Sequence, residues 1–428
     1  MISSPATSAC ETLGYSSRGR PLIANFCGVP TADLRIFILA GQHGDEPDAR
    51  DAAAEFLIRA LTGQLQAQVH LAILIDANPD GAAARTRRNA QDIDLNRDHL
   101  FLSTPETLAV HRFIEKWKPD LILDVHTYRP WRKELMPYDF VFPQEMMIDF
   151  PTNPAVRTAV GPALQRNAMN FVATRMAEAN IRNDRYTLIR PDMVRHSTAE
   201  VLDARNNLAL RFEVPVVLLE GRRASPDDSI EFTPPQTAIL RAIQAVVDWA
   251  VENARELRHR PPASDKTPIR CHYTGSAAHC YMEMQSAIKG GISRTRLPGS
   301  YLPEVTATKT IEMPAAYGVP RSLTGVLDIL AKHQFLTGET QSPQAETYRI
   351  ESITPAIEED SPPLPLCSRE SASVNLKDYI LYPAQQTGRS LLALLLEPES
   401  QYGPHRLPEL AAALQPGATY PIVRVAVL

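Results

Sequence analysis

Four apolar, β-branched stretches of the chain each end in polar residues of the kinds that metal-assisted chemistry uses. They are residues 34–43 with Glu46 just beyond, and residues 69–78, 121–126 and 214–220. In open parallel sheets, ligands bind beyond the carboxyl ends of the strands. We therefore expect the polar residues that follow these strands to share one site.

The metal part of this site is predicted to be His43, Glu46 and His126. Two nitrogens and one carboxylate suit zinc, and three protein ligands leave a fourth position open for water, as in catalytic rather than structural sites. A lone His-x-x-Glu pair is common by chance. Here His43 lies just beyond the end of a predicted strand, His126 closes a second strand, and residues 78–98 between them are dense in polar side chains. The pattern predicts one zinc ion per chain.

Six ordered motifs make the chain resemble the zinc carboxypeptidase superfamily in its short bacterial form, which is related to the succinylglutamate desuccinylases. The motifs are His43-Gly44-Asp45-Glu46, Asn78-Pro79-Asp80-Gly81, Arg87-x-Asn89, Asp94-Leu95-Asn96-Arg97, His126-Thr127-Tyr128 and Glu220. Their order matches over about residues 12–258, and the opening segment 13–22 resembles the first hairpin of that family. The resemblance implies an α/β fold with a mixed, mostly parallel twisted sheet flanked by helices.

The resemblance also implies a role for each motif. His43, Glu46 and His126 would hold zinc, and Asp94 would orient His43, as carboxylates commonly do for metal-bound imidazoles. Glu220 would be the general base and acid, Arg87 would polarise the scissile carbonyl, and Asn96 with Arg97 would grip a substrate carboxylate.

Glu220 has a chemical reason of its own to be considered. A zinc-activated water still needs a carboxylate to accept its proton and pass it to the leaving amine. Glu220 closes an apolar strand, where a buried carboxylate without a partner would be costly. The alternative is an ion pair with Arg222 or Arg223 at the strand end.

The arginines are harder to assign individually. Guanidinium groups can hold a carboxylate through two parallel bonds or stabilise an oxyanion. The spacing to Asn89 favours Arg87 as the residue that stabilises the oxyanion, with Arg88 as the second choice. The alternative is that these arginines form a solvated run of charges on the surface. Arg97 is a stronger candidate because it follows a polar loop with little reason to be in a core.

Two further residues are candidates for substrate specificity. Arg205, about fifteen residues before Glu220, could read a second acidic group on the substrate. Its alternative is a salt bridge to Asp203 or Glu213. Tyr128, directly after the zinc histidine, could form a pocket wall, although an aromatic residue at a strand end is more often simply packed.

Whole-chain properties fit a globular enzyme. The 428 residues are 44% hydrophobic and 22% charged, with a net charge of −5, so nothing suggests nucleic acid or an anionic membrane as a partner. No apolar run reaches the ~20 residues of a membrane span, and no secretory signal is visible. Five widely spaced cysteines favour a reduced, cytoplasmic setting. Cys271 and Cys280, with the two histidines between them, could form a metal clip, but their spacing is unlike common zinc patterns.

Proline positions and apolar periodicity predict helices between the strands. They are expected over residues 48–61, 106–117, 155–179 and 236–257, each presenting an apolar stripe to the sheet. Connections of helical length between parallel strands imply right-handed crossovers.

The composition and the predicted secondary structure of the sequence change after about residue 258. A polar, proline-bearing linker over residues 258–264 is followed by short β-like runs such as 346–353 and 420–428, with one helix expected over 322–333. The expectation is a catalytic domain over residues 1–260 and a β-rich domain of unknown role over residues 265–428.

These patterns predict a zinc-dependent carboxypeptidase-type hydrolase acting on a small peptide or an N-acyl amino acid, at an amide bond beside a residue that bears a free carboxylate. An N-acyl amino acid deacylase or desuccinylase with the same zinc site is the alternative within the enzyme class. A catalytically silent binding protein is a third possibility, but all three predicted ligands and Glu220 are present. The released amino acid, the acyl side and the oligomeric state do not follow from the sequence.

Overall fold

The computed structural model describes residues 9–63, 68–156, 161–196, 198–226, 228, 230–259, 264–339, 344–355 and 362–426. Its first half is built on an eight-stranded sheet with the order β1-β2-β4-β3-β5-β11-β7-β8. These strands are Ala9–Tyr15 (β1), Pro21–Gly28 (β2), Val69–Leu74 (β4), Leu34–Ala40 (β3), Leu121–Tyr128 (β5), Val216–Arg222 (β11), Met146–Asp149 (β7) and Asn183–Arg185 (β8).

The centre of this sheet is parallel and its margins are partly antiparallel. Strands β4, β3, β5 and β11 run parallel to one another. The hairpin β1–β2 and the strand β7 join antiparallel, and β8 pairs in parallel with β7. The central strands are buried nearly throughout, as expected for strands covered on both faces. The predicted mixed, mostly parallel α/β fold is confirmed.

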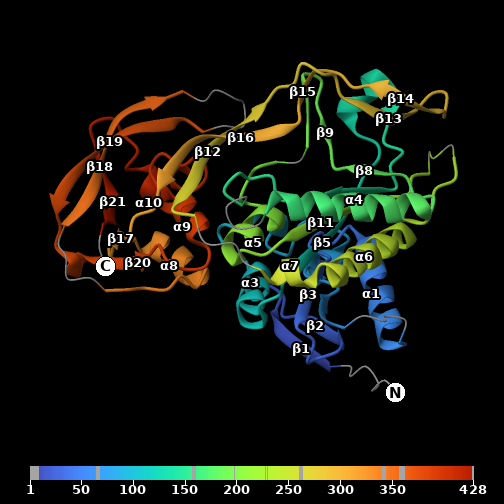
Figure 1. Cartoon of the computed structure of the whole chain (residues 1–428), viewed down its shortest axis with the longest axis horizontal. Coiled ribbons are helices and arrows are strands. Elements are labelled where there is room, and N and C mark those ends of the chain that lie inside the picture. Colours follow the sequence, from blue (N-terminus) through green and yellow to red (C-terminus); the bar gives the residue numbers. More distant parts are fainter. Residues whose placement is uncertain are drawn as a thin grey trace.

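Helices cover both faces of the sheet (Figure 1). On one face lie α1 (Pro47–Leu61), α4 (Pro162–Glu178) and α6 (Pro235–Glu252), followed by the short α7 (Ala254–Arg258). On the other lie α3 (Pro105–Trp117) and α5 (Ala204–Phe212). Alternation along β3 divides the core accordingly: Ile36 and Ile38 pack with α1 and α6, whereas Phe37 and Leu39 pack with α3 and α5.

The helix predictions are close to the structure, with two differences. The helix expected over 155–179 is described from Pro162, and residues 157–160 lie outside the described part of the chain. The helix expected over 236–257 is two helices, α6 and α7, separated at Asn253. The short helix α2 (Pro79–Ala84) follows Asn78, whose side chain accepts a hydrogen bond from the Gly81 backbone N–H at 2.9 Å and so caps the helix.

The second half is β-rich and carries a five-stranded sheet with the order β19-β18-β21-β17-β20. These strands are Leu364–Ser373, Gln344–Thr354, Thr419–Val425, Ala316–Pro320 and Tyr379–Pro383 in that order. Helices α8 (Thr324–Lys332), α9 (Arg389–Leu396) and α10 (Pro408–Ala411) accompany it. The helix predicted over 322–333 is α8. The fully buried α9 was not predicted, because its residues 391–396 are all apolar and show no alternation with polar positions.

Several strands join the two halves. The ribbon β12 (Lys266–Thr274) and β16 (Glu304–Glu312) runs between the two sheets in Figure 1. Strand β15 (Ser300–Leu302) pairs with β10 (Met193–Arg195), which also pairs with β9 (Leu188–Ile189). Strand β13 (Tyr281–Ser286) pairs with β14 (Ile292–Arg296) and with β6 (Phe140–Val141).

The hydrophobic core is also shared between the halves. One buried cluster runs from Phe37 and Leu208 in the first half to Leu391 and Tyr420 in the second. The linker predicted over 258–264 falls mostly on residues 260–263, which lie outside the described residues. The division into domains 1–260 and 265–428 stays a prediction. Because one buried cluster includes residues of both halves, any such domains would pack against each other through apolar side chains.

Candidate metal centre and active site

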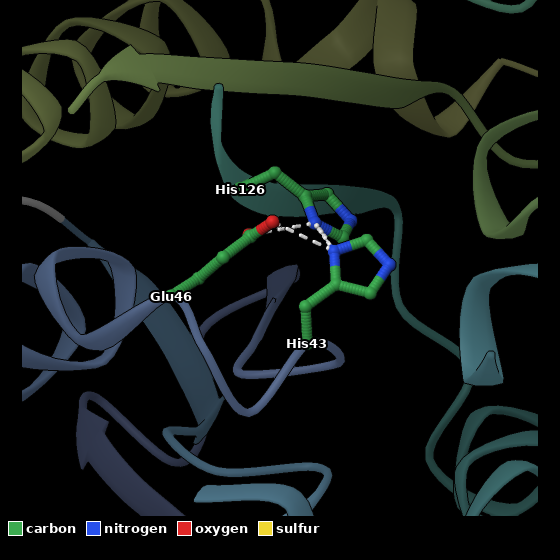
Figure 2. Close-up of side chains that lie close together, drawn as sticks. All are labelled: His43, Glu46 and His126. Atoms are coloured by element: carbon green, nitrogen blue, oxygen red, sulfur yellow. Dashed lines mark hydrogen bonds and ion pairs between the residues drawn. The ribbon is translucent and has the colours of Figure 1, made fainter. Parts of the chain in front are cut away.

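The three predicted zinc ligands meet at the carboxyl edge of the eight-stranded sheet. His43 and Glu46 lie in the loop between β3 and α1, and His126 lies near the end of β5. Figure 2 shows the two imidazoles and the carboxylate pointing toward one another. Their ligand atoms all lie within 4.8 Å of one another, and no other such group of His, Cys, Asp or Glu occurs among the described residues. Cys271 and Cys280 therefore form no metal clip in that part of the chain.

The atoms that converge are those a cation would bind. His43 Nδ1 lies 2.8 Å from Glu46 Oε1, and His126 Nδ1 lies 3.2 Å from Glu46 Oε2. The two Nδ1 atoms are only 3.1 Å apart. All three side chains are buried, so the site offers two nitrogens and one oxygen in a water-poor setting. This donor set fits zinc.

Two carboxylates fix which ring nitrogen faces the site. His43 Nε2 lies 3.1 Å from Asp94 Oδ1, and His126 Nε2 lies 2.9 Å from Asp124 Oδ1. A carboxylate only accepts, so each Nε2 carries the proton and each Nδ1 keeps its lone pair for a metal. Asp94 thus lies where the sequence predicted it. Asp124 was missed, although its place two residues before His126 on a buried strand puts both on the same face.

Charge at the site agrees with this geometry. Burial raises the pKa of Glu46, but the charge of His43 and hydrogen bonds to both histidines outweigh it and hold the pKa well below its usual range. Burial lowers the pKa of His126, but Asp124 and Glu46 outweigh it and raise the pKa well above its usual range. The carboxylates around the two histidines therefore stabilise positive charge at this site.

A buried polar chain extends from Asp124 into the protein. Gln42 Nε2 donates to Asp124 at 2.7 Å, and its Oε1 lies 2.8 Å from His99 Nε2. His99 Nδ1 lies 3.1 Å from His111 Nε2, and the ring of His111 meets that of His333 edge-on at 5.4 Å. His333, at the end of α8, lies 2.9 Å from the Leu100 carbonyl through Nε2. Sequence reasoning missed this chain because its members are far apart in sequence.

One glycine lets the ligand loop pack closely. A Cβ on Gly44 would lie 1.9 Å from the backbone carbon of Gly81, which is impossible without moving one of the two segments. The absence of a side chain at Gly44 therefore brings the loop that carries His43 and Glu46 against α2.

Glu220 lies beside the metal ligands on the neighbouring strand. It is in register with His126 across β5 and β11, so both side chains project from the same face of the sheet. Burial, and after it the nearby charge of Glu46, raises the pKa of Glu220 against the opposing effect of His126.

The ion pair considered as an alternative for Glu220 is absent among the described contacts. Arg222 binds Asp228, and Arg223 binds Asp45 and Glu46 instead. A half-buried carboxylate in register with a predicted zinc ligand, with a raised pKa, is suited to take up and release a proton.

Arg87 is next to the metal ligands, and Arg88 is not. Arg87 Nε donates to Asp94 Oδ2 at 2.9 Å, and its NH1 lies 3.9 Å from Glu46 Oε1. Arg88 instead pairs with the exposed Asp92 at 3.1 Å. The geometry thus favours Arg87 over Arg88 as the oxyanion partner, and the role itself stays a prediction.

Asn96 and Arg97 lie in a short 3-10 turn (Leu95–Arg97) capped by Asp94. Asn96 Nδ2 lies 3.3 Å from His126 Nε2, and its Oδ1 accepts a hydrogen bond from the Ala204 N–H at 2.8 Å. Arg97 is exposed, and its NH1 donates to the Asn96 carbonyl at 2.6 Å. The turn therefore carries the predicted carboxylate-binding pair beside the metal ligands.

The alternatives considered for Arg205 and Tyr128 are both present in the structure. Arg205 is buried and lies 3.3 Å from Asp203 and 3.4 Å from Asp149, and it donates to the Thr198 carbonyl at 2.8 Å. The Tyr128 hydroxyl donates to the Gln144 carbonyl, and the ring packs edge-on against Phe142. Both side chains have structural partners, and a contact of either with substrate stays a prediction.

Comparisons with known proteins show what the N-terminal part of the chain is similar to. Residues 2–140, which include all three ligands and the Arg87–Arg97 segment, match the family model described as zinc carboxypeptidase. The resemblance to the zinc carboxypeptidase superfamily that the motifs predicted is confirmed over this N-terminal part of the chain.

Individual relatives are distant and only partly covered. The chain is 23% identical over 235 residues to carboxypeptidase 2 of Trichophyton rubrum, covering 52% of this chain and 43% of the relative. It is 33% identical over 125 residues to carboxypeptidase SOL1 of Arabidopsis thaliana, covering 23% and 25%. The chain thus spans less than half the length of the curated relatives it matches.

Among solved structures, a metallo-carboxypeptidase from Pseudomonas aeruginosa matches 58% of this chain and 65% of its own. The TM-score is 0.43 and the identity 22%. In the described part of the chain, no helix combines the length and apolar character needed to cross a membrane.

Proposed function

We propose that the chain is a zinc-dependent carboxypeptidase-type hydrolase that cleaves an amide bond beside a residue with a free carboxylate. The observation that carries this proposal is the convergence of His43, Glu46 and His126, with Glu220 in register beside them. The match of residues 2–140 to the zinc carboxypeptidase family supports it. No disulfide joins the five cysteines, all of which are described, and the proposal keeps the cytoplasmic setting expected from the sequence.

The chain's own residues would divide the work as follows. Zinc held by the three ligands would polarise the scissile carbonyl and make a water molecule more acidic. Glu220 would accept the proton of that water and deliver it to the leaving nitrogen. Arg87 would stabilise the oxyanion, and Asn96 with Arg97 would hold the terminal carboxylate so that the scissile bond stays near the metal ligands.

An N-acyl amino acid deacylase remains the second candidate, because the same site would serve both reactions and both substrates carry a free carboxylate beside the scissile amide. The two differ on the acyl side. Incubating the zinc-loaded protein with matched mixtures of N-acyl dipeptides and N-acyl amino acids, read by mass spectrometry, would separate them. Cleavage confined to the N-acyl amino acids would replace the peptidase by the deacylase.

A thermodynamic cycle that combines one change in the substrate with one mutation tests whether Arg97 binds the substrate carboxylate. Once a cleaved substrate is found, replacing its carboxylate by an amide should lower kcat/KM by about 30- to 1000-fold, since charged, paired hydrogen bonds lose several kcal/mol when one partner is removed. Arg97→Met acting on the free acid should show a similar loss. The two changes together should cost little more than either one.

Arg88→Met is the matched control for this cycle, because Arg88 is exposed and pairs only with Asp92 among the described ion pairs. It should leave both substrates unaffected. Additive losses in the Arg97 cycle, or an amide cleaved as fast as the acid, would show that Arg97 does not bind the carboxylate.

A further inference from the structure

The buried side chains behind Asp124 connect the predicted metal centre to the second half of the molecule. Gln42, His99, His111 and His333 are each no more than 2% exposed. The first three belong to the first half, and His333 lies at the end of α8 in the second half. None of these four residues has a part in the proposed hydrolysis.

The carboxylate at the inner end sets the direction of every hydrogen bond in this chain. Asp124 only accepts, so the Gln42 group 2.7 Å from it is the amide NH2, and the amide oxygen faces His99. That oxygen also only accepts, so His99 donates to it from Nε2 at 2.8 Å. Burial lowers the pKa of His99 to about 4, so near pH 7 its Nδ1 is free to accept from His111 Nε2 at 3.1 Å. Bonds aligned in one direction strengthen one another.

The inner end of the chain lies directly against the predicted ligands. Gln42 precedes His43 in the ligand loop, and its Nε2 lies 3.3 Å from His126 Nε2. Both nitrogens donate to the same oxygen, Oδ1 of Asp124, at 2.7 and 2.9 Å. Gln42 thus holds that oxygen in the place where it accepts from His126.

The outer end of the chain is held by the second half. His333 Nε2 lies 2.9 Å from the carbonyl of Leu100, the residue after His99. The ring of His333 meets the ring of His111 edge-on, with 5.4 Å between the ring centres. Arg211 of α5 in turn donates to the His333 carbonyl at 2.7 Å. These contacts keep the end of α8 beside the His99–His111 pair.

We propose that Gln42 and His99 are positioning residues for the metal centre. They hold the Asp124 carboxylate against His126. From the second half, His333 keeps His99 in place. The inference rests on the proposed function, because it requires zinc at the three predicted ligands.

The expected consequence is weaker zinc binding when the chain is broken. Without the Gln42 amide, the buried Asp124 carboxylate loses a donor at Oδ1 and is free to turn away from His126. Without His99, the Gln42 amide is free to rotate and to present its oxygen to the carboxylate. Loss of the outer partners of a metal site typically weakens metal binding by about 10- to 100-fold.

The test measures zinc affinity by competition between the metal-free protein and a chromophoric chelator. Gln42→Leu and His99→Phe should each weaken zinc binding by at least about 10-fold. His99→Gln keeps a donor for the Gln42 oxygen and should recover part of the affinity. His333→Leu acts one residue further out and should weaken zinc binding by at least about 3-fold.

A double-mutant cycle shows whether Gln42 acts through Asp124. Asp124→Ala removes the carboxylate and should weaken zinc binding by about 10- to 100-fold. Adding Gln42→Leu should weaken it by less than about 2-fold more, because the contact that Gln42 supports is already lost. Additive losses would show that Gln42 acts by another route and would overturn the proposal.

Tyr317→Phe is the control for a general loss of stability. The Tyr317 hydroxyl is buried in the second half and donates to Glu397 at 2.7 Å. Its removal should lower the urea midpoint of the metal-free protein, because a buried hydrogen bond is lost. Zinc affinity should stay within about 2-fold of the parent, because distant sites act independently.

The outcomes separate this inference from the proposed function. Parent-like zinc affinity in Gln42→Leu or His99→Phe would overturn the inference, and parent-like affinity in His333→Leu would overturn the role of the second half. Weakening in Tyr317→Phe as large as in these variants would also overturn it, because the losses would then reflect stability alone. Each of these results leaves the proposed function standing. A parent protein that binds no zinc would instead reject the proposed function, and this inference with it.

Discussion

Each half of the molecule buries a glutamate among polar partners, and the partners differ in kind. In the second half, Glu397 accepts hydrogen bonds from Arg424 NH1 at 2.6 Å and from the Tyr317 hydroxyl at 2.7 Å, with the Tyr348 hydroxyl as a third donor. Every one of these neighbours is a donor. That carboxylate is fully satisfied and can serve structure alone.

At the carboxyl edge of the first half, the neighbours of Glu46 include two imidazoles that also face each other. His43 Nδ1 and His126 Nδ1 are 3.1 Å apart, and the opposite nitrogen of each ring faces a carboxylate. Lone pairs that converge in a buried place favour a cation. The difference between the two glutamates thus separates a structural cluster from a metal centre.

The largest expected effect is on metal content. The parent should hold about one zinc per chain, and His126→Ala should lose most of it, because only two ligands would remain. Elemental analysis after dialysis measures this directly. His70→Ala, a change on β4 of the same sheet but outside the ligand group, is the matched control and should keep its zinc. Equal zinc in His126→Ala and the parent would remove His126 from the ligand set.

The second expected effect is on stability. Glu397→Leu should lower the free energy of unfolding by roughly 3 to 5 kcal/mol, because it leaves Arg424 buried without its main counter-charge. Zinc content should stay at the parent level. Urea unfolding followed by circular dichroism provides the measurement.

Two variants sharpen this result. Glu346 also faces Arg424, at 3.5 Å, but is 42% exposed, so Glu346→Gln should cost less than about 1 kcal/mol. Adding Arg424→Met to Glu397→Leu should restore part of the loss, since a paired apolar replacement removes the lone buried charge. A Glu397→Leu protein that loses zinc but not stability would contradict the comparison.

The third expected effect is a loss of turnover in variants that keep their zinc. Glu220→Gln should keep its zinc and its substrate affinity but lower kcat by at least ~100-fold, because proton transfer typically contributes that much. Arg87→Met should also depress kcat more than it raises KM, since an oxyanion partner acts mainly in the transition state. Steady-state kinetics with zinc analysis decides both, and near-parent turnover in Glu220→Gln would reject the mechanism.

The smallest effect is on the pH dependence of stability. Burial lowers the pKa of His333 to about 3, so below pH ~6.5 the unfolded chain binds a proton that the native state does not. Stability is therefore full above that pH and falls as the pH drops toward 3, by up to about 1.4 kcal/mol per pH unit from this residue.

His333→Leu should flatten that slope by up to one proton, and the exposed His272→Leu should not. Urea midpoints between pH 4.5 and 7 give the slopes. An unchanged slope in His333→Leu would show that His333 is already charged in the native protein.

Short-range patterns were enough to predict the first contacts of the site. His43 and Glu46 are recognisable because they follow a strand end in a compact motif, and His126 because it closes a buried strand; Asp94 was predicted from the motif of the family that the chain resembles. Gln42 and His99 were missed, since their partners come from distant segments and a glutamine beside a ligand has no distinctive pattern. The contacts of Arg205 depend on Asp149 and Thr198, which only the folded chain brings to it.

The same limit applies to the fold. Periodicity predicted α1, α3 and α8 because each has one apolar face, and it missed α9, which is buried on every side. The pairing of β10 with β15 links residues more than a hundred positions apart, so no local pattern could reveal it.

That pairing has a consequence for protein engineering. Because β15 adds directly to β10, one edge of β10 is covered from outside the segment that carries the predicted metal ligands. A fragment that ends before residue 264 would keep those ligands but expose the edge of β10 that β15 covers, so it would need a replacement strand there.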